Sequence, residues 1–218
     1  DGLAEAHNDP EIRCVLITGN EECFTAGNDL GEFENGMPEE FRATPVGRFL
    51  FALAEATKPV VAAVNGPAVG IGTTMLLHCD LAWAGNNTTF RMPFVNLGLC
   101  AEGASSLLLP QWLGRARAGE LLLLGRPFNA DRAERFGLIN GVCAPEETET
   151  TAMEACRELT ALPPGAIRAT KELIGQSQAH SVEQAMTCEG DLFAKRLESP
   201  EAKEAFTAFR EKRKPDFS

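Results

Sequence analysis

The sequence predicts an α/β protein on two observations. Short apolar runs that end at glycine have the length of buried strands, at 13–19 ("RCVLITG") and 59–66 ("PVVAAVNG"). Between them, 48–57 ("RFLFALAEAT") places apolar residues at helical spacing. A buried strand, a helix and a second buried strand in succession predict a sheet covered by helices.

The composition excludes two classes of partner. With 218 residues, 44% hydrophobic and 23% charged, the chain can bury a large core. Its formal net charge of -11 repels phosphate backbones, and the tail "REKRKP" at 210–215 is the one basic cluster in the sequence, so we expect no nucleic-acid partner. No apolar run approaches the roughly 20 residues that a bilayer crossing needs, so we expect no membrane partner.

Cysteine and histidine usage predicts no metal site. The seven cysteines are odd in number and form no C-x-x-C pair. They are interpreted as reduced core residues of an intracellular protein, in a bacterial cytoplasm or an organelle matrix: Cys14, Cys23, Cys79, Cys100, Cys143, Cys156 and Cys188. The three histidines are far apart in sequence, and His78 lies in an apolar helical pattern that favours a core role.

The remaining pattern divides the chain near residue 145. Further strands are predicted at 80–85, 88–94 and 138–145, and an apolar helix that ends near Asp80. The polar segment 31–47 is predicted to be mobile. From about Glu146 onward the sequence pattern predicts only helices and turns, so we expect a core at 1–145 and a helical region at 146–218.

Two strand-to-helix turns could bind an oxyanion. Ala26-Gly27 follows the first strand, and Gly70-Ile71-Gly72 follows the second. The first N–H groups of a helix have no intrahelical partner and carry a favourable dipole. Two such donors that converge form an oxyanion hole. Glycine at such turns also serves backbone geometry alone, and neither turn matches a P-loop or a complete G-x-G-x-x-G.

Several segments together resemble the crotonase, or enoyl-CoA hydratase/isomerase, superfamily. They are "CFTAGNDL" (23–30), "KPVVAAVNGPAVGIG" (58–72), "HCDLAWAG" (78–85), "FRMPFVNLGLCAEGASSLLLP" (90–110) and "GRPFNADRAERFGLIN" (125–140). The resemblance runs from Ile12 to the tail "KRKPDF". It implies a spiral of ββα units followed by a helical trimerisation region, and a homotrimer or homohexamer. The family's opening β-hairpin is missing, so we expect a chain trimmed at its start.

The resemblance also implies a binding site for an acyl-CoA. The N–H groups of Ala26 and Ile71 would bind the thioester oxygen; most relatives have glycine at Ile71, but a main-chain donor survives the change. Coenzyme A enters as part of the substrate, and no separate cofactor is implied. Cationic groups from the missing N-terminal part or from the tail near Lys212 and Lys214 are expected near its phosphates. The expected substrate-binding residues are Thr25, Gly27, Asn28, Asp29, Gly70, Phe94 and Leu99.

The resemblance makes Glu102 the candidate base. Hydratases of the family use two glutamates, and the matching positions hold Thr74 and Phe94, which cannot transfer protons as carboxylates do. The segment "NLGLCAEGASS" (96–106) is similar to the Δ3,Δ2-enoyl-CoA isomerase branch typified by peroxisomal enzymes, in which the glutamate of an "EG" pair takes the proton. The hypothesis is that Glu102 moves a proton from C2 to C4 of a 3-enoyl-CoA.

Other interpretations remain open at this point. Glu102 could only favour the positive end of the following helix, worth about 0.3–1 kcal/mol. Phe94, Leu99 and Trp112 could raise its pKa or be plain core. The chain could be another crotonase-type enzyme, such as a hydratase, or a non-catalytic acyl-CoA-binding subunit. Asp29 is expected to cap a helix and Asp80 to be structural, and Glu32 and Glu34 are expected to be solvated.

Overall fold

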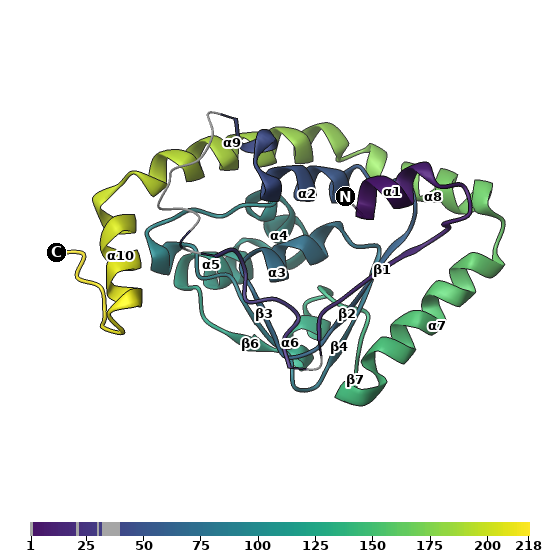
Figure 1. Ribbon diagram of the computed structural model, residues 1–218, viewed down its shortest axis with the longest axis horizontal. Helices are drawn as coiled ribbons and strands as arrows, with labels where there is room; N and C mark the ends of the chain where they lie inside the picture. Colours follow the sequence, from purple (N-terminus) through teal and green to yellow (C-terminus); the bar gives the residue numbers. More distant parts are fainter. Residues whose placement is uncertain (1, 21, 30, 32–39) are drawn as a thin grey trace.

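Two sheets form the centre of the protein. The computed structural model describes residues 2–20, 22–29, 31 and 40–218 (Figure 1). The larger sheet is parallel throughout, in the order β1 (Val15–Thr18), β2 (Val60–Val64), β4 (Leu81–Gly85) and β7 (Gly141–Cys143). In the smaller sheet, β5 (Thr89–Arg91) pairs parallel with β3 (Pro67–Val69) and antiparallel with β6 (Phe128–Asn129). The α/β prediction is confirmed.

The chain alternates between the two sheets. It passes from β2 to β3 through Gly66, whose φ of +66° suits glycine, and then enters α3 (Ile71–Thr74). It passes likewise from β4 to β5 and then to the short helix η4 (Val95–Leu97) and α4 (Ser105–Leu113). Each passage is a ββα unit, as the family resemblance implies.

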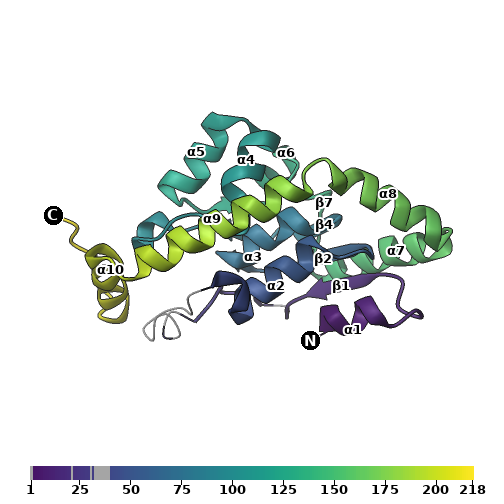
Figure 2. The ribbon, with the colours of Figure 1, turned by 90° about the horizontal axis from the view of Figure 1, so that it is seen from above.

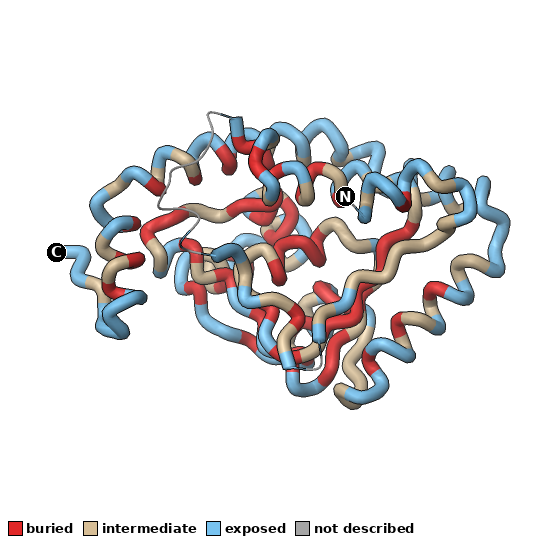
Figure 3. The backbone as a smooth tube through the Cα atoms, in the orientation of Figure 1, coloured by how far each residue is buried: buried red, intermediate tan, exposed pale blue. Residues whose placement is uncertain are grey.

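Helices cover both faces of the larger sheet (Figures 1 and 2). All five residues of β2 are buried, which fits its central place in the sheet. Val61 and Ala63 point to α7 (Thr148–Ala161) on one face and pack with Ala152 and Cys156. The alternate residues of β2 point to the main core beneath α2 (Pro45–Ala54). Figure 3 shows this buried band through the middle of the molecule.

The remaining helices surround this centre. They are α1 (Gly2–Asn8), η2 (Phe41–Ala43), η3 (Met75–His78), α5 (Arg115–Leu124), α6 (Ala130–Arg135), η5 (Pro145–Glu147), α8 (Pro164–Gln176), α9 (Ala179–Leu197) and α10 (Pro200–Arg210). After η5 the described chain is helical until the tail, as predicted, and the division near residue 145 stays a prediction. Within the described residues, no helix has the length and apolar character needed to cross a bilayer.

Two helix predictions were wrong in extent. The single helix expected up to Asp80 is a short α3 followed by η3, since the chain must re-enter the larger sheet at Leu81. Helix α2 begins at Pro45 rather than at Arg48, because the Thr44 hydroxyl caps it by accepting the N–H of Gly47 at 2.9 Å.

Predictions for segment 31–47 and for Asp29 are settled only in part. Residues 32–39, with Glu32 and Glu34, lie outside the described residues, as does most of the helix that Asp29 was expected to cap. The Asp29 carboxylate accepts the N–H of Gly31 at 2.8 Å. Beyond the gap the chain is well packed: Phe41 is 7% exposed and joins the main core.

Three predictions about polar core residues can be compared with the structure. His78 is half-buried and its Nε2 lies 2.8 Å from the carbonyl oxygen of Gly103. Asp80 is structural: it accepts the N–H of Val60 at 2.7 Å and pairs with Lys171. All seven thiols are free, but Cys188 is exposed on α9, so the core prediction is wrong for this cysteine.

Helix α10 is seated against a glycine. Gly98 has a φ of +71°, and a Cβ built on it would lie 2.6 Å from the backbone nitrogen of Ala202 in α10. The carbonyl oxygen of Gly98 also accepts the Nε of Arg196 at 2.9 Å. The contact fixes the C-terminal helices on the core.

We expect Gly98→Ala to lower the free energy of unfolding by about 2 kcal/mol, because a methyl group would meet main-chain atoms that cannot move aside easily. Thermal unfolding followed by circular dichroism measures the loss. The matched control is Gly137→Ala, which has a similar φ of +73° but open space around its Cβ. Equal losses in the two variants would contradict the packing argument.

Candidate active site

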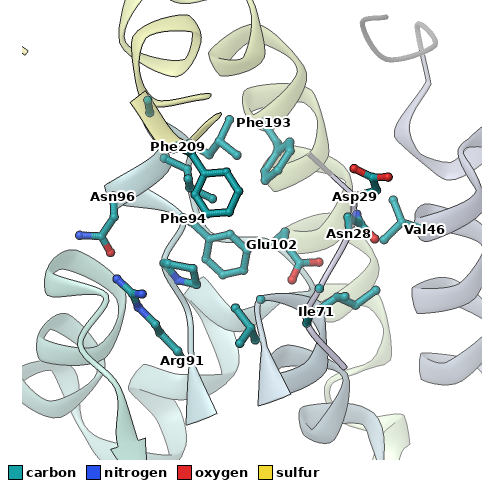
Figure 4. Close-up of a pocket in the computed structure, with 18 of the residues that line it drawn as sticks. Asn28, Asp29, Val46, Ile71, Arg91, Phe94, Asn96, Glu102, Phe193 and Phe209 are labelled. Carbon is teal, nitrogen blue, oxygen red and sulfur yellow. The ribbon is translucent and has the colours of Figure 1, made fainter. Parts of the chain in front are cut away.

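A cavity of about 530 Å³ brings together nine of the ten residues predicted for the site (Figure 4). They are Ala26, Gly27, Asn28, Asp29, Gly70, Ile71, Phe94, Leu99 and Glu102. These residues come from the loop after β1, the start of α3 and the segment between β5 and α4. The sequence-based grouping of these positions therefore corresponds to one pocket.

The two candidate turns meet in space. Thr25 forms a β-bridge with Ala68, and the N–H of Val69 donates to the carbonyl oxygen of Thr25 at 3.0 Å. Gly70 then starts α3 with a φ of +58°, a conformation that favours glycine, and its N–H donates to Arg91 O at 2.8 Å. The bridge places the turn at Ala26 beside the first turn of α3.

The backbone N–H groups of Ala26 and Ile71 are both available. Neither has a hydrogen-bond partner within the part of the chain that the structure describes. Both residues line the cavity, and Ile71 is the first residue of α3, where N–H groups lack intrahelical partners. The pair has the chemistry of an oxyanion hole.

Thr25 is the one predicted site residue that lies outside the cavity lining, and its role in substrate binding stays a prediction. Thr25 does not line the cavity; its hydroxyl accepts the N–H of Gly27 at 3.1 Å and its methyl group lies against Gly72. Through these two contacts the Thr25 side chain stabilises the conformation of the loop. Because the Gly27 N–H is already bonded, Ala26 offers the free donor of this turn.

Glu102 is a buried carboxylate with one oxygen unused. The residue is 6% exposed, and the Thr74 hydroxyl donates to Oε1. Oε2 is fully buried and has no partner among the described residues. Figure 4 shows the carboxylate inside the pocket, between Phe94 and Ile71. An unpaired buried oxygen is costly to the fold and points to a functional role.

Burial raises the pKa of Glu102 to about 7 from its ordinary value of 4.5. The hydrogen bond from Thr74 opposes this rise in pKa, and the nearby carboxylate of Glu189 adds to it. A carboxylate with a pKa near neutrality is a better base than a solvated one, and about half of it is ionised near pH 7.

The carboxylate of Glu102 does not accept hydrogen bonds from the N–H groups at the start of α4. The N–H groups of Ala104 and Ser106 donate instead to Glu189, at 2.6 Å and 2.9 Å. Helix α4 begins at Ser105, so Glu189 fills the role that could otherwise explain an acidic residue at this position. The carboxylate of Glu102 is left directed at Thr74 and the pocket.

Apolar side chains line the cavity that contains the candidate base. Phe94 and Leu99 are buried and line the cavity as expected. The ring of Phe193 meets that of Phe94 edge-on, with centroids 6.5 Å apart. Trp112, the third apolar neighbour considered, is 42% exposed and does not line the cavity, because it projects from the far end of α4.

Sequence reasoning missed the part of the pocket that comes from the C-terminal helices and tail. These lining residues are Phe193, Ala205, Phe209, Arg213 and Pro215. Arg213 pairs with Glu204 and Glu211, so its charge is largely compensated. Lys212 and Lys214, the cations expected near the phosphates, do not line the cavity. The amphipathic patterns of α9 and α10 indicate that each helix packs on one face, but they do not indicate which part of the protein that face contacts.

No cluster of three or more potential metal ligands occurs among the His, Cys, Asp and Glu residues that the structure describes. The pocket chemistry rests on one buried carboxylate and two main-chain donors.

Comparisons with known proteins identify the family to which the chain belongs. Residues 1–218 match the family described as enoyl-CoA hydratase/isomerase. Crotonyl-CoA hydratase of Syntrophomonas wolfei is 34% identical over 220 residues, covering 100% of this chain and 85% of the relative. Enoyl-CoA delta isomerase 2 of Rattus norvegicus is 35% identical over 181 residues, which cover 81% of this chain and 46% of the relative. The structure of Pseudomonas aeruginosa OdaA superposes with a TM-score of 0.92 and 48% sequence identity, and the match covers 95% of this chain and 84% of that structure's chain.

The chain therefore belongs to the enoyl-CoA hydratase/isomerase family and is an enzyme of that family. The crotonase resemblance is confirmed, and an acyl-CoA substrate is consistent with it. The narrower isomerase branch is not singled out, since hydratase names are the more frequent among curated relatives of similar identity.

The raised pKa of Glu102 makes the folded protein less stable as the pH rises. Below pH 4.5 the carboxyl is neutral in both the folded and the unfolded chain, and above about 7 it is charged in both. Between these values the unfolded chain releases a proton that the folded protein retains, so stability falls with rising pH. The difference corresponds to about 3 kcal/mol.

We expect Glu102→Gln, which is neutral at every pH, to unfold at a higher temperature than the parent at about pH 8, and to lose this advantage near pH 4.5. Above pH 7 its free energy of unfolding should exceed that of the parent by about 3 kcal/mol. Denaturant unfolding at several pH values measures it. The exposed Glu146→Gln should leave the dependence on pH as in the parent; a constant gain at all pH values for Glu102→Gln would contradict the assignment.

Proposed function

We propose that the protein is an enoyl-CoA isomerase that moves the double bond of a 3-enoyl-CoA from C3 to C2. The observation that carries the proposal is the free Oε2 of Glu102, buried in the same cavity as the unpartnered N–H groups of Ala26 and Ile71. One base and one oxyanion hole are sufficient for this reaction.

The first step removes a proton. Oε2 of Glu102 takes a proton from C2, and the electron pair of that C–H bond moves into the C1–C2 bond. The thioester oxygen becomes negatively charged and is held by the N–H groups of Ala26 and Ile71, whose orientation is fixed before the reaction begins.

The second step returns the same proton. The enolate and the C3–C4 double bond form one conjugated dienolate, so protonation at C4 by the carboxylic acid of Glu102 leaves a double bond between C2 and C3. The thioester carbonyl is restored. The walls formed by Phe94, Leu99 and Phe193 exclude water that would otherwise exchange with the proton.

Hydration of a 2-enoyl-CoA is the second candidate, because hydratase names are frequent among the relatives. Hydration needs one group to activate water and another to protonate carbon. Thr74 and Phe94 stand where the family's two glutamates would lie, and Asp29 is the second acidic residue that lines the cavity. Asp29 is exposed and bonded to the N–H of Gly31, which favours the one-base reaction.

A homotrimer or homohexamer and a cytoplasmic location remain part of this proposal, as does the absence of a separate cofactor. The oligomer and the lack of a cofactor are implied by the family resemblance, and the intracellular location, in a bacterial cytoplasm or an organelle matrix, by the cysteine usage.

We expect the protein to convert a 3-enoyl-CoA into the conjugated 2-enoyl isomer, measured as a rise in ultraviolet absorbance. Glu102→Ala should reduce the rate by about 10²-fold or more, since it removes the only proposed base.

The matched control for this assay is Glu146→Ala, which removes an exposed carboxylate distant in sequence from the lining residues and should keep the parent rate. A parallel assay follows loss of absorbance from a 2-enoyl-CoA. Hydration without isomerisation would favour the second candidate. An isomerisation rate unaffected by Glu102→Ala would exclude the one-base mechanism.

We expect kcat/KM to rise with pH through about 7, as Glu102 ionises, and Thr74→Val to move this rise to higher pH. The Thr74 hydroxyl stabilises the charged carboxylate, so its removal raises the pKa of Glu102 further. At about pH 6 the variant should be about tenfold slower than the parent, and it should recover at high pH. The control is Thr73→Val, whose hydroxyl bonds to Ala68 O instead; a shift shared by both variants would contradict this role.

A further inference from the structure

We propose that Glu189 is a positioning residue for Glu102, which clamps the turn that carries the base through the N–H groups of Ala104 and Ser106. Glu189 lies on α9, does not line the cavity and cannot touch substrate. The inference rests on the proposed function, because it concerns how Glu102 is held for proton transfer.

The clamp joins two parts of the chain that are distant in sequence. Glu189 is 7% exposed, and each of its oxygens accepts one N–H: Oε2 from Ala104 at 2.6 Å and Oε1 from Ser106 at 2.9 Å. Both oxygens accept fully only in the ionised carboxylate. The bonds lie two and four residues from Glu102, so a movement of Glu189 would displace the base.

The turn held by the clamp has a strained backbone. Gly103 has a φ of +67°, and Ala104, with a φ of +57°, is one of two non-glycine residues with positive φ in the described chain. A side chain in this conformation is unfavourable unless its surroundings impose it. The two successive left-handed residues reverse the chain between Glu102 and α4, which leaves the Glu102 side chain in the pocket.

The position of Glu189 is itself fixed by packing. The next residue, Gly190, has no room for a side chain, since a Cβ there would lie 2.5 Å from Phe41. Helix α9 also packs against α4 and α2. In Figures 1 and 2, α9 runs along one side of the core across these elements. The clamp therefore has a rigid support.

The charge of Glu189 also acts on the base. It raises the pKa of Glu102, whereas the Thr74 hydroxyl lowers it. Other ionisable groups around the turn do not replace this effect: burial lowers the pKa of His78 and raises that of the Cys100 thiol to about 11, so both are neutral near pH 7. Arg196, on α9 with Glu189, donates its Nε to Gly98 O and pairs with Glu201.

The test is Glu189→Gln, which keeps the size of the side chain but removes its charge and presents an N–H group to one of the two donors. We expect kcat to fall by about 10-fold or more with KM changed less than about twofold, because the base is misplaced while the binding groups remain. The rise of kcat with pH should move to lower pH, opposite to the shift expected for Thr74→Val.

A second readout does not depend on turnover. The carboxyl stretch of protonated Glu102 is followed against pH as the infrared difference between each protein and its Glu102→Gln derivative. Its titration midpoint should be lower in Glu189→Gln than in the parent. Glu198→Gln, which removes an exposed carboxylate just beyond the end of the same helix, should change neither kcat nor the midpoint. An inactive parent would refute the proposed function, whereas an active parent whose kcat and midpoint are unchanged by Glu189→Gln would refute only the inference.

Loss of folding is separated from loss of positioning by Ala104→Gly combined with Glu189→Gln, because glycine adopts the positive φ without support. The folded double variant should still show the lowered midpoint and the lowered kcat. A midpoint equal to that of the parent, or a kcat within twofold of the parent, would mean that Glu189 only caps α4 and would overturn the proposal.

Discussion

The site depends on the β-bridge between Thr25 and Ala68. This contact joins the loop after β1 to the smaller sheet and so brings two main-chain donors from separate turns to one cavity. It requires glycine at Gly72, where a side chain would collide with Thr25. Because the donors are backbone groups, the arrangement tolerates a side chain at Ile71, and specificity near the two donors is left to the side chains around them.

Glu102 illustrates a conflict between stability and reactivity. Its carboxylate is removed from water, receives one hydrogen bond from Thr74 and keeps its second oxygen unpaired. Burial and the unpaired oxygen are unfavourable for the folded state when the group is charged, and burial makes the group a stronger base; the hydrogen bond from Thr74 opposes both effects. The surrounding elements resist the resulting tendency to rearrange: Thr74 holds the carboxylate from α3, and α9 supports the turn from the other side.

Local patterns in the sequence were sufficient for most of the fold and for the first half of the pocket. The strands at Val60–Val64 and Leu81–Gly85 follow from short apolar runs, and the family motifs identify Ala26, Ile71 and Glu102. Thr25 lies outside the cavity lining, which the motif could not indicate because a motif does not reveal which way a side chain points. The contributions of Phe193 and Arg213 could not be predicted, since they depend on how helices of the C-terminal region pack against distant elements.

The pocket spans nearly the whole chain, from Ala26 to Pro215. Its last walls are supplied by α10 and the tail, and α10 is seated against Gly98. The residues of the candidate oxyanion hole and base, Ala26, Ile71 and Glu102, are therefore synthesised long before the residues that close the cavity around them. The sheets can form early in synthesis, but the cavity can close only once translation has passed Pro215.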